Sequence, residues 1–600
     1  MAGSGWVSRA STSSSEAAAA LGRAVGTTPV LDTAETRESF LQSVRLVGRE
    51  YELAQRMGAL LAATHGHGSA WLVGGESGVG KSRLLDELRA RAHVEGAMVV
   101  RGVAEAASGP YGPWRELLRA LVVGGELKDF DASVLLPIVP ELPRLLARPV
   151  TPAPELDGPS MHTRLRQVVL RLLQRQVRPV VLILEDLQWA SSATLELLRA
   201  LEPHVASLPL LLLGTYRTEE RAQLREQLAS FRGVTLERLS PQAVGELAAS
   251  MLGQAQVPPA LVALLVRESE GNAFFVVEVV RALAEDAGGV DRIAERALPE
   301  RVLAGGMRRV LRRRLDRLAP EHVAPLRLAA ALGRRIEGEL LAHAQPGLDV
   351  ERWIRSGIDA AVLERIGGDT HFAHDKLREE VLRELSADER RALHARAAQA
   401  LEGLHGDAPE LAVALAMHHA AAGDTAREAY YSARAGEIAL AHGAHHEAAE
   451  RIERALVLRS DLTALERARL FYQLGSAYFY MMDFGRADAA LRESARAVGV
   501  DIPHQGLPRA RFLLAQLWGQ LRHNLVGAPL APPERRAELE EASRAAARLS
   551  NLLIFQNDEL GVLGASLLAV NLADRCGHTN HLSLSLLGFA ASAAGLTRAS

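Results

Sequence analysis

The sequence predicts a multidomain protein in which a P-loop α/β domain with a parallel three-layer sheet is followed by all-helical regions. Two observations lead to this fold class. Apolar runs near residues 71, 97, 180 and 210 have the length of buried strands and alternate with amphipathic helical patterns. From Arg391 onward the chain is rich in alanine and leucine at helical spacing, which is typical of stacked helix pairs.

The composition limits the classes of protein to which the chain can belong. With 48% hydrophobic and 24% charged residues it is an ordinary globular sequence, and its net charge of −3 gives no general affinity for nucleic acid. The single cysteine, Cys576, excludes an intramolecular disulfide framework and suits a reducing compartment. No apolar run approaches the roughly 18 residues of a membrane span, so we expect a cytoplasmic protein without membrane contact. Residues 1–37 are rich in small and polar residues and are expected to be a disordered tail or linker.

The first apolar run leads into the motif with the most specific chemistry. Residues 75–82, Gly-Glu-Ser-Gly-Val-Gly-Lys-Ser, fit the phosphate-binding pattern G-x-x-x-x-G-K-[ST] between a strand and a helix. The glycines let backbone N–H groups turn toward phosphates, and the helix N-terminus adds a partial positive charge. Lys81 would reach the β- and γ-phosphates of ATP or ADP, and the Ser82 hydroxyl would bind Mg²⁺. The cofactor-binding candidates here are Gly75, Glu76, Ser77, Gly78, Val79, Gly80, Lys81, Ser82 and Arg83.

Two adjacent acids, Glu185 and Asp186, follow the apolar run that begins at Val180. A run of this length predicts a buried parallel strand, and α/β sheets place their ligands at the carboxyl ends of strands. This pattern is typical of a Walker B element. One acid would hold the Mg²⁺ shell while its neighbour orients or deprotonates the attacking water, because strand alternation points the two carboxylates in different directions. The sequence leaves open which acid is nearer the metal, so Ser82, Glu185 and Asp186 are together the metal-binding candidates.

Shorter features complete the predicted α/β domain. Residues 105–178 form a long insertion, of which the proline-rich part 149–160 is expected to be a surface loop. Ser191 is placed to cap the helix that follows the two acids. Leu236 to Leu239 is expected to add an edge or closing strand, and Pro241 then begins an all-helical segment.

The stretch Leu46-Val47-Gly48-Arg49-Glu50 lies shortly before the P-loop, and Leu187-Gln188-Trp189-Ala190 follows the two acids. Taken in this order the motifs resemble the signal-transduction ATPases with numerous domains, the STAND class of AAA-related ATPases. The resemblance implies that Val47, Gly48 and Arg49 contact the nucleotide base or phosphates. The alternative interpretation is a helix cap with an ion pair.

The resemblance extends to three further positions. It implies that Arg217, after Gly214-Thr215-Tyr216, is a sensor near the γ-phosphate, whereas the alternative is a solvated arginine at a strand end. Residues 270–275, Glu-Gly-Asn-Ala-Phe-Phe, resemble a stretch of the helical lid, although Ala273 replaces the proline that usually packs on the nucleotide. His374 resembles the histidine that holds the β-phosphate of ADP in some STAND proteins, and the alternative is a helix-capping histidine beside Asp375.

Domain boundaries follow from the same resemblance. We expect a P-loop ATPase domain over residues 38–239, a helical lid over 240–298, a winged helix over 299–390 and tetratricopeptide-like repeats over 391–600. Two segments match the alternation of small and large residues in such repeats. Their signature positions are Gly436, Ala448, Ile452 and Ala455 in one segment and Leu474, Gly475, Tyr478, Ala487 and Leu491 in the other.

An arginine-rich helical pattern stands at the start of the predicted winged helix. Its arginines are Arg301, Arg308, Arg309, Arg312, Arg313, Arg314 and Arg317, and the apolar residues between them follow helical spacing. The favoured interpretation is a solvated face with acidic neighbours, and the alternative is a surface for nucleic acid.

The sequence thus favours a regulatory ATPase that binds ATP with Mg²⁺, hydrolyses it slowly and couples the nucleotide state to domain arrangement. Two other functions stay open: a non-hydrolysing nucleotide-binding scaffold and a DNA-binding regulator that uses the winged helix. The helical repeats predict a protein partner, with self-association as a further candidate and nucleic acid disfavoured. The resemblance is to ATPase modules that bacteria join to serine/threonine kinases, LuxR-type regulators or nucleotide cyclases, so it implies a kinase or regulator among the partners.

Overall fold

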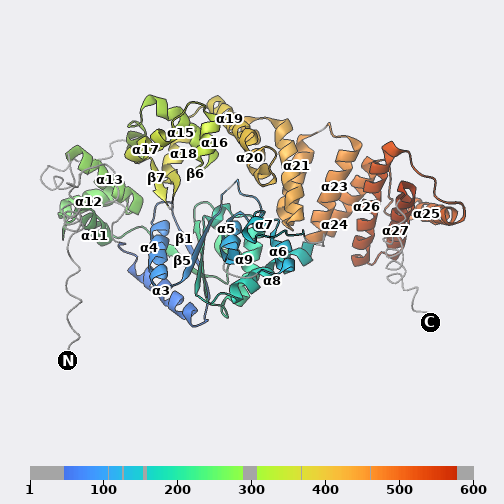
Figure 1. Cartoon of the computed structure of the whole chain (residues 1–600), viewed down its shortest axis with the longest axis horizontal. Coiled ribbons are helices and arrows are strands. Elements are labelled where there is room, and N and C mark those ends of the chain that lie inside the picture. The colour runs from blue at the N-terminus through green and yellow to red at the C-terminus, as the bar shows by residue number, and fades with distance from the viewer. Residues whose placement is uncertain are drawn as a thin grey trace. The chain divides into compact units, whose positions relative to one another are not determined.

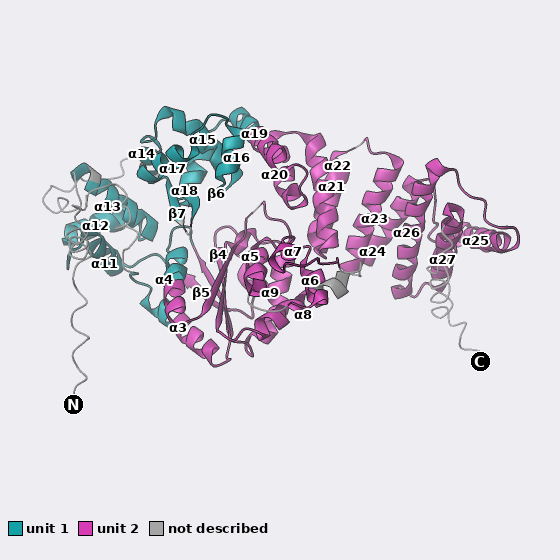
Figure 2. Ribbon diagram, in the orientation of Figure 1, with its two compact units in different colours: residues 1–54, 76–87, 236–393 teal, residues 55–75, 88–235, 394–600 magenta. Residues whose placement is uncertain are grey.

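The computed structural model describes residues 46–105, 107–123, 127–152, 158–287, 307–366, 368–459 and 461–577. The expected disordered tail, residues 1–37, lies outside these ranges. The chain divides into two compact units (Figure 2). One contains residues 76–87 and 236–393, and the other contains 55–75, 88–235 and 394 onward. We describe each unit by itself.

Within the described residues a five-stranded parallel sheet forms the centre of the α/β domain (Figure 1). Its strands are β1 (Ser69–Gly75), β2 (Met98–Val103), β3 (Val180–Glu185), β4 (Leu210–Arg217) and β5 (Arg232–Leu236), in the order β2-β3-β4-β1-β5. β3 and β4 are buried at every position, as continuous apolar runs predict for strands covered on both faces. The predicted P-loop α/β fold and the helical region after it are confirmed.

Helices connect these strands and cover the sheet. They are α3 (Glu50–Thr64), α4 (Lys81–Val94), α5 (Gly112–Val123), α6 (Asp129–Leu135), α7 (Leu142–Leu145), α8 (Gly158–Gln174), η1 (Leu187–Trp189), α9 (Ser192–Val205) and α10 (Leu224–Gln227). Four of them, α5 to α8, lie in the insertion 105–178. Trp114, Leu117 and Leu118 of α5 are fully buried, so the insertion belongs to the domain core.

The prediction of a strand over Leu236 to Leu239 was wrong in position. The strand β5 comes earlier and ends at Leu236. Leu239 packs instead with Val47 and Ala243, and its backbone N–H donates to the carbonyl oxygen of Gly271 at 2.7 Å. β5 escaped prediction because most of its residues are exposed, so it lacks the apolar run that identifies a buried strand.

The segment after the sheet is helical, as predicted. Its helices are α11 (Pro241–Leu252), α12 (Pro259–Ser269) and α13 (Ala273–Ala287). Ser240 caps α11, since its side chain accepts a hydrogen bond from the N–H of Ala243, and Pro241 occupies the first turn, where its missing N–H costs nothing. Val244, Leu265 and Val276 lie at the centre of the apolar core that the three helices share.

Residues 307–385 combine helices with a small antiparallel sheet. The elements are α14 (Met307–Leu315), α15 (Pro320–Leu332), β6 (Arg335–Ile336), α16 (Gly338–Ala344), α17 (Val350–Asp359), β7 (Leu363–Ile366), β8 (Asp369–Phe372) and α18 (Asp375–Arg383). The strands pair in the order β6-β8-β7. These elements lie within residues 299–390, where the winged helix was expected.

The arginines of α14 differ in their surroundings. Arg312 lies 3.2 Å from Glu384 and is exposed, as the solvated interpretation predicts. Arg314 is 4% exposed instead, and it forms an ion pair with Glu278 of α13. The side chains of Arg301, Arg308 and Arg309 lie outside the described residues.

The remaining described residues form successive helix pairs (Figure 1). They are α19 (Ala387–His405), η3 (Pro409–Leu411), α20 (Ala412–Ala422), α21 (Thr425–Ala441), α22 (His445–Leu458), α23 (Ala464–Tyr480), α24 (Phe484–Ala497), α25 (Gly506–Val526), α26 (Pro533–Phe555) and α27 (Glu559–Cys576). Small residues allow close packing within the pairs: a Cβ on Gly436 would lie 2.6 Å from Ile452, and one on Gly475 would lie 2.7 Å from Leu491. These contacts join the residues that the repeat pattern singled out.

Across the described ranges, the helices are all too short or too polar to cross a membrane.

Candidate nucleotide site

The P-loop has the local structure that its sequence predicts. β1 ends at Gly75 and α4 begins at Lys81, so residues 76–80 form the connecting loop. The backbone at Gly78 has a φ of 82°, which residues other than glycine rarely adopt. A Cβ there would also lie 2.8 Å from the Asn272 side chain. Glycine at this position therefore serves both the turn and the approach of the lid.

Two residues of the predicted lid (residues 240–298) hold the P-loop by donating to backbone carbonyl oxygens of the loop. The side-chain amide of Asn272 donates to the carbonyl oxygen of Ser77 at 3.0 Å. The backbone N–H of Phe274 donates to the carbonyl oxygen of Gly78 at 3.0 Å. Asn272 is 3% exposed, so its amide is positioned by the protein and not by solvent. These contacts occupy carbonyl oxygens, which a phosphate would not use, and they fix the course of the loop.

The charged residues of the loop have defined partners. Lys81 donates from Nζ to the carbonyl oxygen of Glu76 at 2.9 Å, so its ammonium lies over the loop itself. The Glu76 carboxylate accepts from Arg238 at 3.0 Å. Arg83 lies 4.0 Å from Glu87 one turn along α4, which directs it along the helix surface. Ser82 belongs to the first turn of α4, where its hydroxyl is adjacent to the loop.

Residues 47–49 pack beside the P-loop and the start of the lid. Val47 is buried in the core of the lid helices. Gly48 has a φ of 67°, and a Cβ there would lie 2.9 Å from Cβ of Ala243. Arg49 is buried and donates to the carbonyl oxygens of Val79, at 3.2 Å, and of Glu237. Burial lowers the pKa of the Arg49 guanidinium, and the nearby Glu52 opposes this shift. The capping and ion-pair interpretation also matches contacts of these residues, since the backbone N–H of Gly48 donates to Glu50 at 3.3 Å and Arg49 lies 3.7 Å from Glu52.

His374 lies against the lid. Its ring stacks on the ring of Phe274, with centroids 3.8 Å apart and an interplanar angle of 22°. Its Nδ1 accepts a hydrogen bond from the backbone N–H of Lys376 at 3.1 Å, so it caps α18. The capping interpretation describes this geometry. The stacking adds a connection, because Phe274 also donates to the P-loop carbonyl of Gly78.

Glu185 and Asp186, in the other unit, have different surroundings. Glu185 is 3% exposed at the end of β3 and forms an ion pair with Arg101 of the neighbouring strand β2. Asp186 follows the strand in a left-handed conformation, with a φ of 56°. That conformation is uncommon for residues other than glycine and more frequent for aspartate and asparagine. The two carboxylates therefore contact different groups, but Asp186 lies beyond β3, so strand alternation does not set its direction.

A small polar network surrounds Asp186. Its backbone N–H donates to the Thr215 hydroxyl at 3.3 Å, and its carboxylate accepts from the Gln188 amide at 3.0 Å. The Gln188 side chain also accepts from the backbone N–H of Arg217 at 3.0 Å. Arg217 is 7% exposed, its guanidinium lies 3.9 Å from Asp186, and it donates to Glu220 at 2.8 Å. Arg217 is therefore buried and is not a solvated arginine at a strand end.

The donor set fits a nucleoside triphosphate and Mg²⁺. A glycine loop, an ammonium and a helix N-terminus are groups that bind phosphate, and a hydroxyl with two carboxylates suits Mg²⁺, which prefers oxygen ligands. In one unit the P-loop residues with Val47, Gly48 and Arg49 are the candidates for the nucleotide, and Ser82 is a candidate metal ligand. Glu185 and Asp186 belong to the other unit, and their assignment as metal ligands stays a prediction.

Sequence reasoning missed several residues of the site. Arg101 could have been suspected, because it is a charged residue in the apolar pattern of β2. Gln188 was noted as part of a motif, yet its bridging position between Asp186 and Arg217 was not evident. The sequence around Glu447 of α22 contains no pattern that indicates its contact with Ala193.

Glu447 takes part in a junction between the helical repeats and α9. Its carboxylate accepts from the backbone N–H of Ala193 at 3.0 Å, in the first turn of the helix that follows Asp186. Ser191 caps the same helix, as predicted, by accepting from the N–H of Thr194 at 3.2 Å. Beside it, His446 Nδ1 lies 3.3 Å from Glu196. A carboxylate at a helix N-terminus is stabilised by the helix dipole.

Comparison with known proteins gives one family match. Residues 45–213 match the model of the AAA ATPase domain. A search of curated proteins found no match. A STAND protein with a tetratricopeptide repeat sensor from Pyrococcus horikoshii is 14% identical, with a TM-score of 0.36 over 93% of this chain and 79% of that chain.

Two further solved structures match a smaller share of this chain. The Walker-type ATPase of Pyrococcus abyssi is 15% identical, with a TM-score of 0.28 over 57% of this chain and 99% of that chain. The Orc1 protein of Aeropyrum pernix, solved in complex with DNA, is 18% identical, with a TM-score of 0.30 over 57% of this chain and 95% of that chain. The range matched by the family model contains the P-loop and both acids.

Proposed function

We propose that this chain is a regulatory ATPase of signal transduction, in which slow Mg²⁺-dependent ATP hydrolysis changes how its helical domains are arranged. The observation that carries the proposal is the attachment of the lid to the P-loop through Asn272 and Phe274. A loop that binds phosphate and is also held by the next domain can transmit the state of the nucleotide. Such a switch requires contacts that differ between the ATP and ADP states.

In the proposed complex the phosphates lie on the P-loop. Lys81 exchanges its contact with the Glu76 carbonyl for the β- and γ-phosphates, which supply a stronger charge-assisted hydrogen bond. Val47, Gly48 and Arg49 border the nucleotide base, since they pack where the loop meets the lid. With Ala273 in place of proline, we expect weak selection for adenine.

Hydrolysis would use the residues at the ends of β3 and β4. One carboxylate of the pair Glu185 and Asp186 accepts a proton from water as the water oxygen bonds to the γ-phosphorus, and the bond to the β–γ bridging oxygen breaks. Arg217 lies next to Asp186, where it would stabilise the negative charge of the transferring phosphoryl group. Bound Mg²⁺ would supply further charge stabilisation and orientation.

The ADP state would be recognised through His374. This histidine already contacts the lid, because it stacks on Phe274. A contact between its ring and the β-phosphate would stabilise a closed arrangement of lid and predicted winged helix. The helical repeats would then present their surface to a protein partner, with a kinase or regulator as the partner that the family resemblance favours.

ATP turnover of acid variants tests the proposal. We expect Glu185→Gln and Asp186→Asn each to lower the rate of phosphate release by roughly 100-fold or more, the range of general base and metal-ligand losses. Only one of the two should also weaken Mg²⁺-dependent nucleotide binding. Glu226→Gln, on the exposed face of α10, is the control for loss of an acid. Full turnover in both acid variants of an active protein would contradict the Walker B assignment.

A specific contact keeps the non-hydrolysing scaffold as a second candidate. The Glu185 carboxylate is held in an ion pair with Arg101, so it is less available to orient an attacking water. If nucleotide binds tightly while the wild type releases no phosphate, the scaffold is the better description. The DNA-binding alternative has less support, because Arg314 is buried and Arg312 lies beside Glu384.

A further inference from the structure

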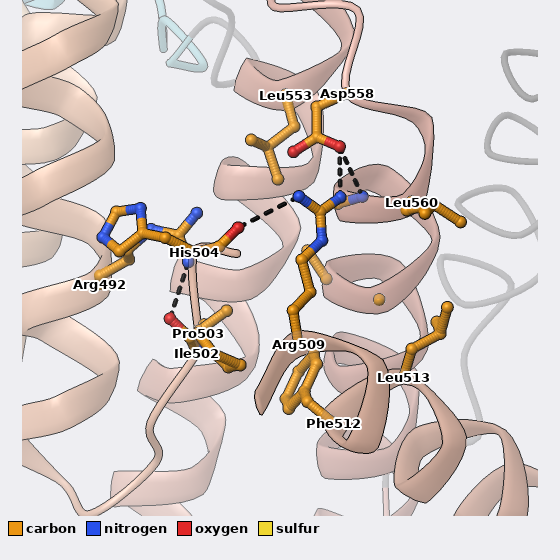
Figure 3. A pocket seen from close by; sticks show the side chains of 13 residues that line it. Arg492, Ile502, Pro503, His504, Arg509, Phe512, Leu513, Leu553, Asp558 and Leu560 are labelled. Atoms are coloured by element: carbon orange, nitrogen blue, oxygen red, sulfur yellow. Dashed lines mark hydrogen bonds and ion pairs between the residues drawn. The ribbon is translucent and has the colours of Figure 1, made fainter. Parts of the chain in front are cut away.

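The side of helix α25 that faces the protein is mixed, because the half-buried Phe512 and Leu513 lie among polar residues. Three polar contacts, two turns apart, join it to α27 and the turn that precedes it. Arg509 forms an ion pair with Asp558, Gln516 accepts at 3.0 Å from the side chain of Asn571, and His523 lies 3.3 Å from Asp574. Figure 3 shows Arg509 directed toward Asp558, with Phe512 on the same side of the helix.

The opposite side of α25 is an apolar seam. Its residues follow each other at alternating spacings of four and three, with Arg511 at one position of the series. All of the apolar ones are exposed: Leu507 64%, Leu514 67%, Trp518 69%, Leu521 50% and Leu525 74%. The structure buries no residue of this helix. A helix in water normally turns such a face inward, so this seam needs an occupant.

The charges beside the seam indicate which class of helix could bind there. α25 contains Arg509, Arg511 and Arg522 and has no acidic residue. Arg509 is paired with Asp558, whereas Arg511 and Arg522 are exposed beside the seam. A second copy of α25 would bring arginines against arginines. Residues 578–600 contain Arg598 and no acid, so the chain's own C-terminal sequence also lacks complementary charge.

We propose that this seam, defined by Leu507, Leu514, Trp518, Leu521 and Leu525, docks an amphipathic helix of another protein whose apolar face is flanked by Asp or Glu. The four-three series matches one facing helix, and the exposed Leu517 lies at its edge. A membrane surface, which takes a broad apolar face, is one outcome of the test below. The proposal names the surface and partner class for the helical repeats. It does not depend on hydrolysis, because none of these residues belongs to the nucleotide site.

The test uses the full chain and two synthetic peptides of the length of α25. Both carry leucines in a four-three seam; one has glutamates and the other lysines on the flanks. We expect the fluorescence anisotropy of the labelled glutamate peptide to report binding, with the lysine peptide weaker by about tenfold or more. The double variant Trp518→Gln/Leu521→Gln should weaken glutamate-peptide binding by about tenfold or more. The matched control is Leu61→Gln/Val457→Gln, which changes exposed apolar residues on α3 and α22.

A charge swap distinguishes specific docking from non-specific apolar binding. Arg511→Glu/Arg522→Glu should reverse the preference, so that the lysine peptide binds better than the glutamate peptide. Equal affinity for both peptides, or no effect of the seam variant, would overturn the proposal. It would also be overturned by self-association in sedimentation that the seam variant abolishes, or by stronger binding to phosphatidylserine–phosphatidylcholine vesicles than to the glutamate peptide. The peptide assay needs no nucleotide, so its outcome is distinguishable from failure of the proposed ATPase.

Discussion

Two junctions attach helical regions to the elements that carry the nucleotide motifs, and they use different chemistry. At the lid junction, Asn272 and Phe274 bind backbone carbonyls of the P-loop through neutral N–H donors. At the repeat junction, the carboxylate of Glu447 binds the N-terminus of α9, and His446 lies beside Glu196. The first junction positions a loop, whereas the second places titratable charges next to a helix dipole.

This difference implies different sensitivities. Neutral hydrogen bonds between buried groups depend little on ionic strength, and their loss acts on the geometry of the loop. Contacts between charges weaken as salt screens them, and they change with protonation. We therefore expect the lid junction to respond to nucleotide and the repeat junction to respond to solution conditions. The following predictions test this division from the largest expected effect to the smallest.

Removal of the loop cation should have the largest effect. Lys81→Ala should weaken ATP binding by roughly 100-fold or more, because charge-assisted hydrogen bonds to phosphate are lost. The Lys81 ammonium lies over the exposed loop, where it donates to the carbonyl oxygen of Glu76, so we expect the thermal midpoint without nucleotide to stay the same. Titration calorimetry measures the affinity, and Arg91→Ala, in the last turn of the same helix, is the control. Unchanged affinity in the Lys81 variant would remove the P-loop from the proposed function.

Loss of a contact at the lid junction should lower nucleotide affinity by a smaller factor. Asn272→Ala removes the donor to the Ser77 carbonyl, and we expect nucleotide affinity to fall by about tenfold, with little dependence on salt. Asn571→Ala is a matched control, since it removes an amide contact of the same length within the helical repeats. If both variants bind nucleotide like the wild type, the lid does not position the loop.

The helical repeats should respond to pH through His442, which lies between α21 and α22. Burial lowers the pKa of His442 to about 4. Its pKa in the unfolded chain is about 6.5, so the neutral ring contributes stability above that pH and the contribution is lost as the pH falls toward about 4. We expect a loss of about 1 kcal/mol between about pH 7 and about pH 5.5 in the wild type.

The variant His442→Gln should lack this part of the pH dependence in urea unfolding. His65→Gln changes an exposed histidine at the end of α3 and serves as the control. A wild type and a His442 variant with parallel pH profiles would show that His442 does not titrate between the two states.

The sequence predicted those features that depend on neighbouring residues. The strand–loop–helix of the P-loop, the burial of β3 and β4 and the Ser191 cap all follow from local spacing. Features set by distant pairing were not predictable. The Arg101–Glu185 pair depends on the register of β2 against β3, and Glu447 and Ala193 are 254 residues apart.

The misplaced strand has a physical cause. β5 is mostly exposed, so its apolar pattern does not mark the side that packs. In α25 likewise, the longest apolar series is exposed. Periodicity gives the type of an element, but its position and orientation depend on neighbours that are remote in the sequence.

The smallest expected effect concerns the carboxylate at α9. Glu447→Gln keeps an oxygen that can accept the Ala193 N–H but removes the charge that interacts with the helix N-terminus. We expect a loss of about 0.5 kcal/mol in the free energy of unfolding at low salt, within the range of such interactions. The loss should shrink in about 1 M salt, where the screening length is about 3 Å. Glu450→Gln, on the exposed side of the same helix, controls for the change in net charge. If the effect of Glu447→Gln is the same at both salt concentrations, the contact acts through its hydrogen bond alone, and the contrast between the two junctions does not hold.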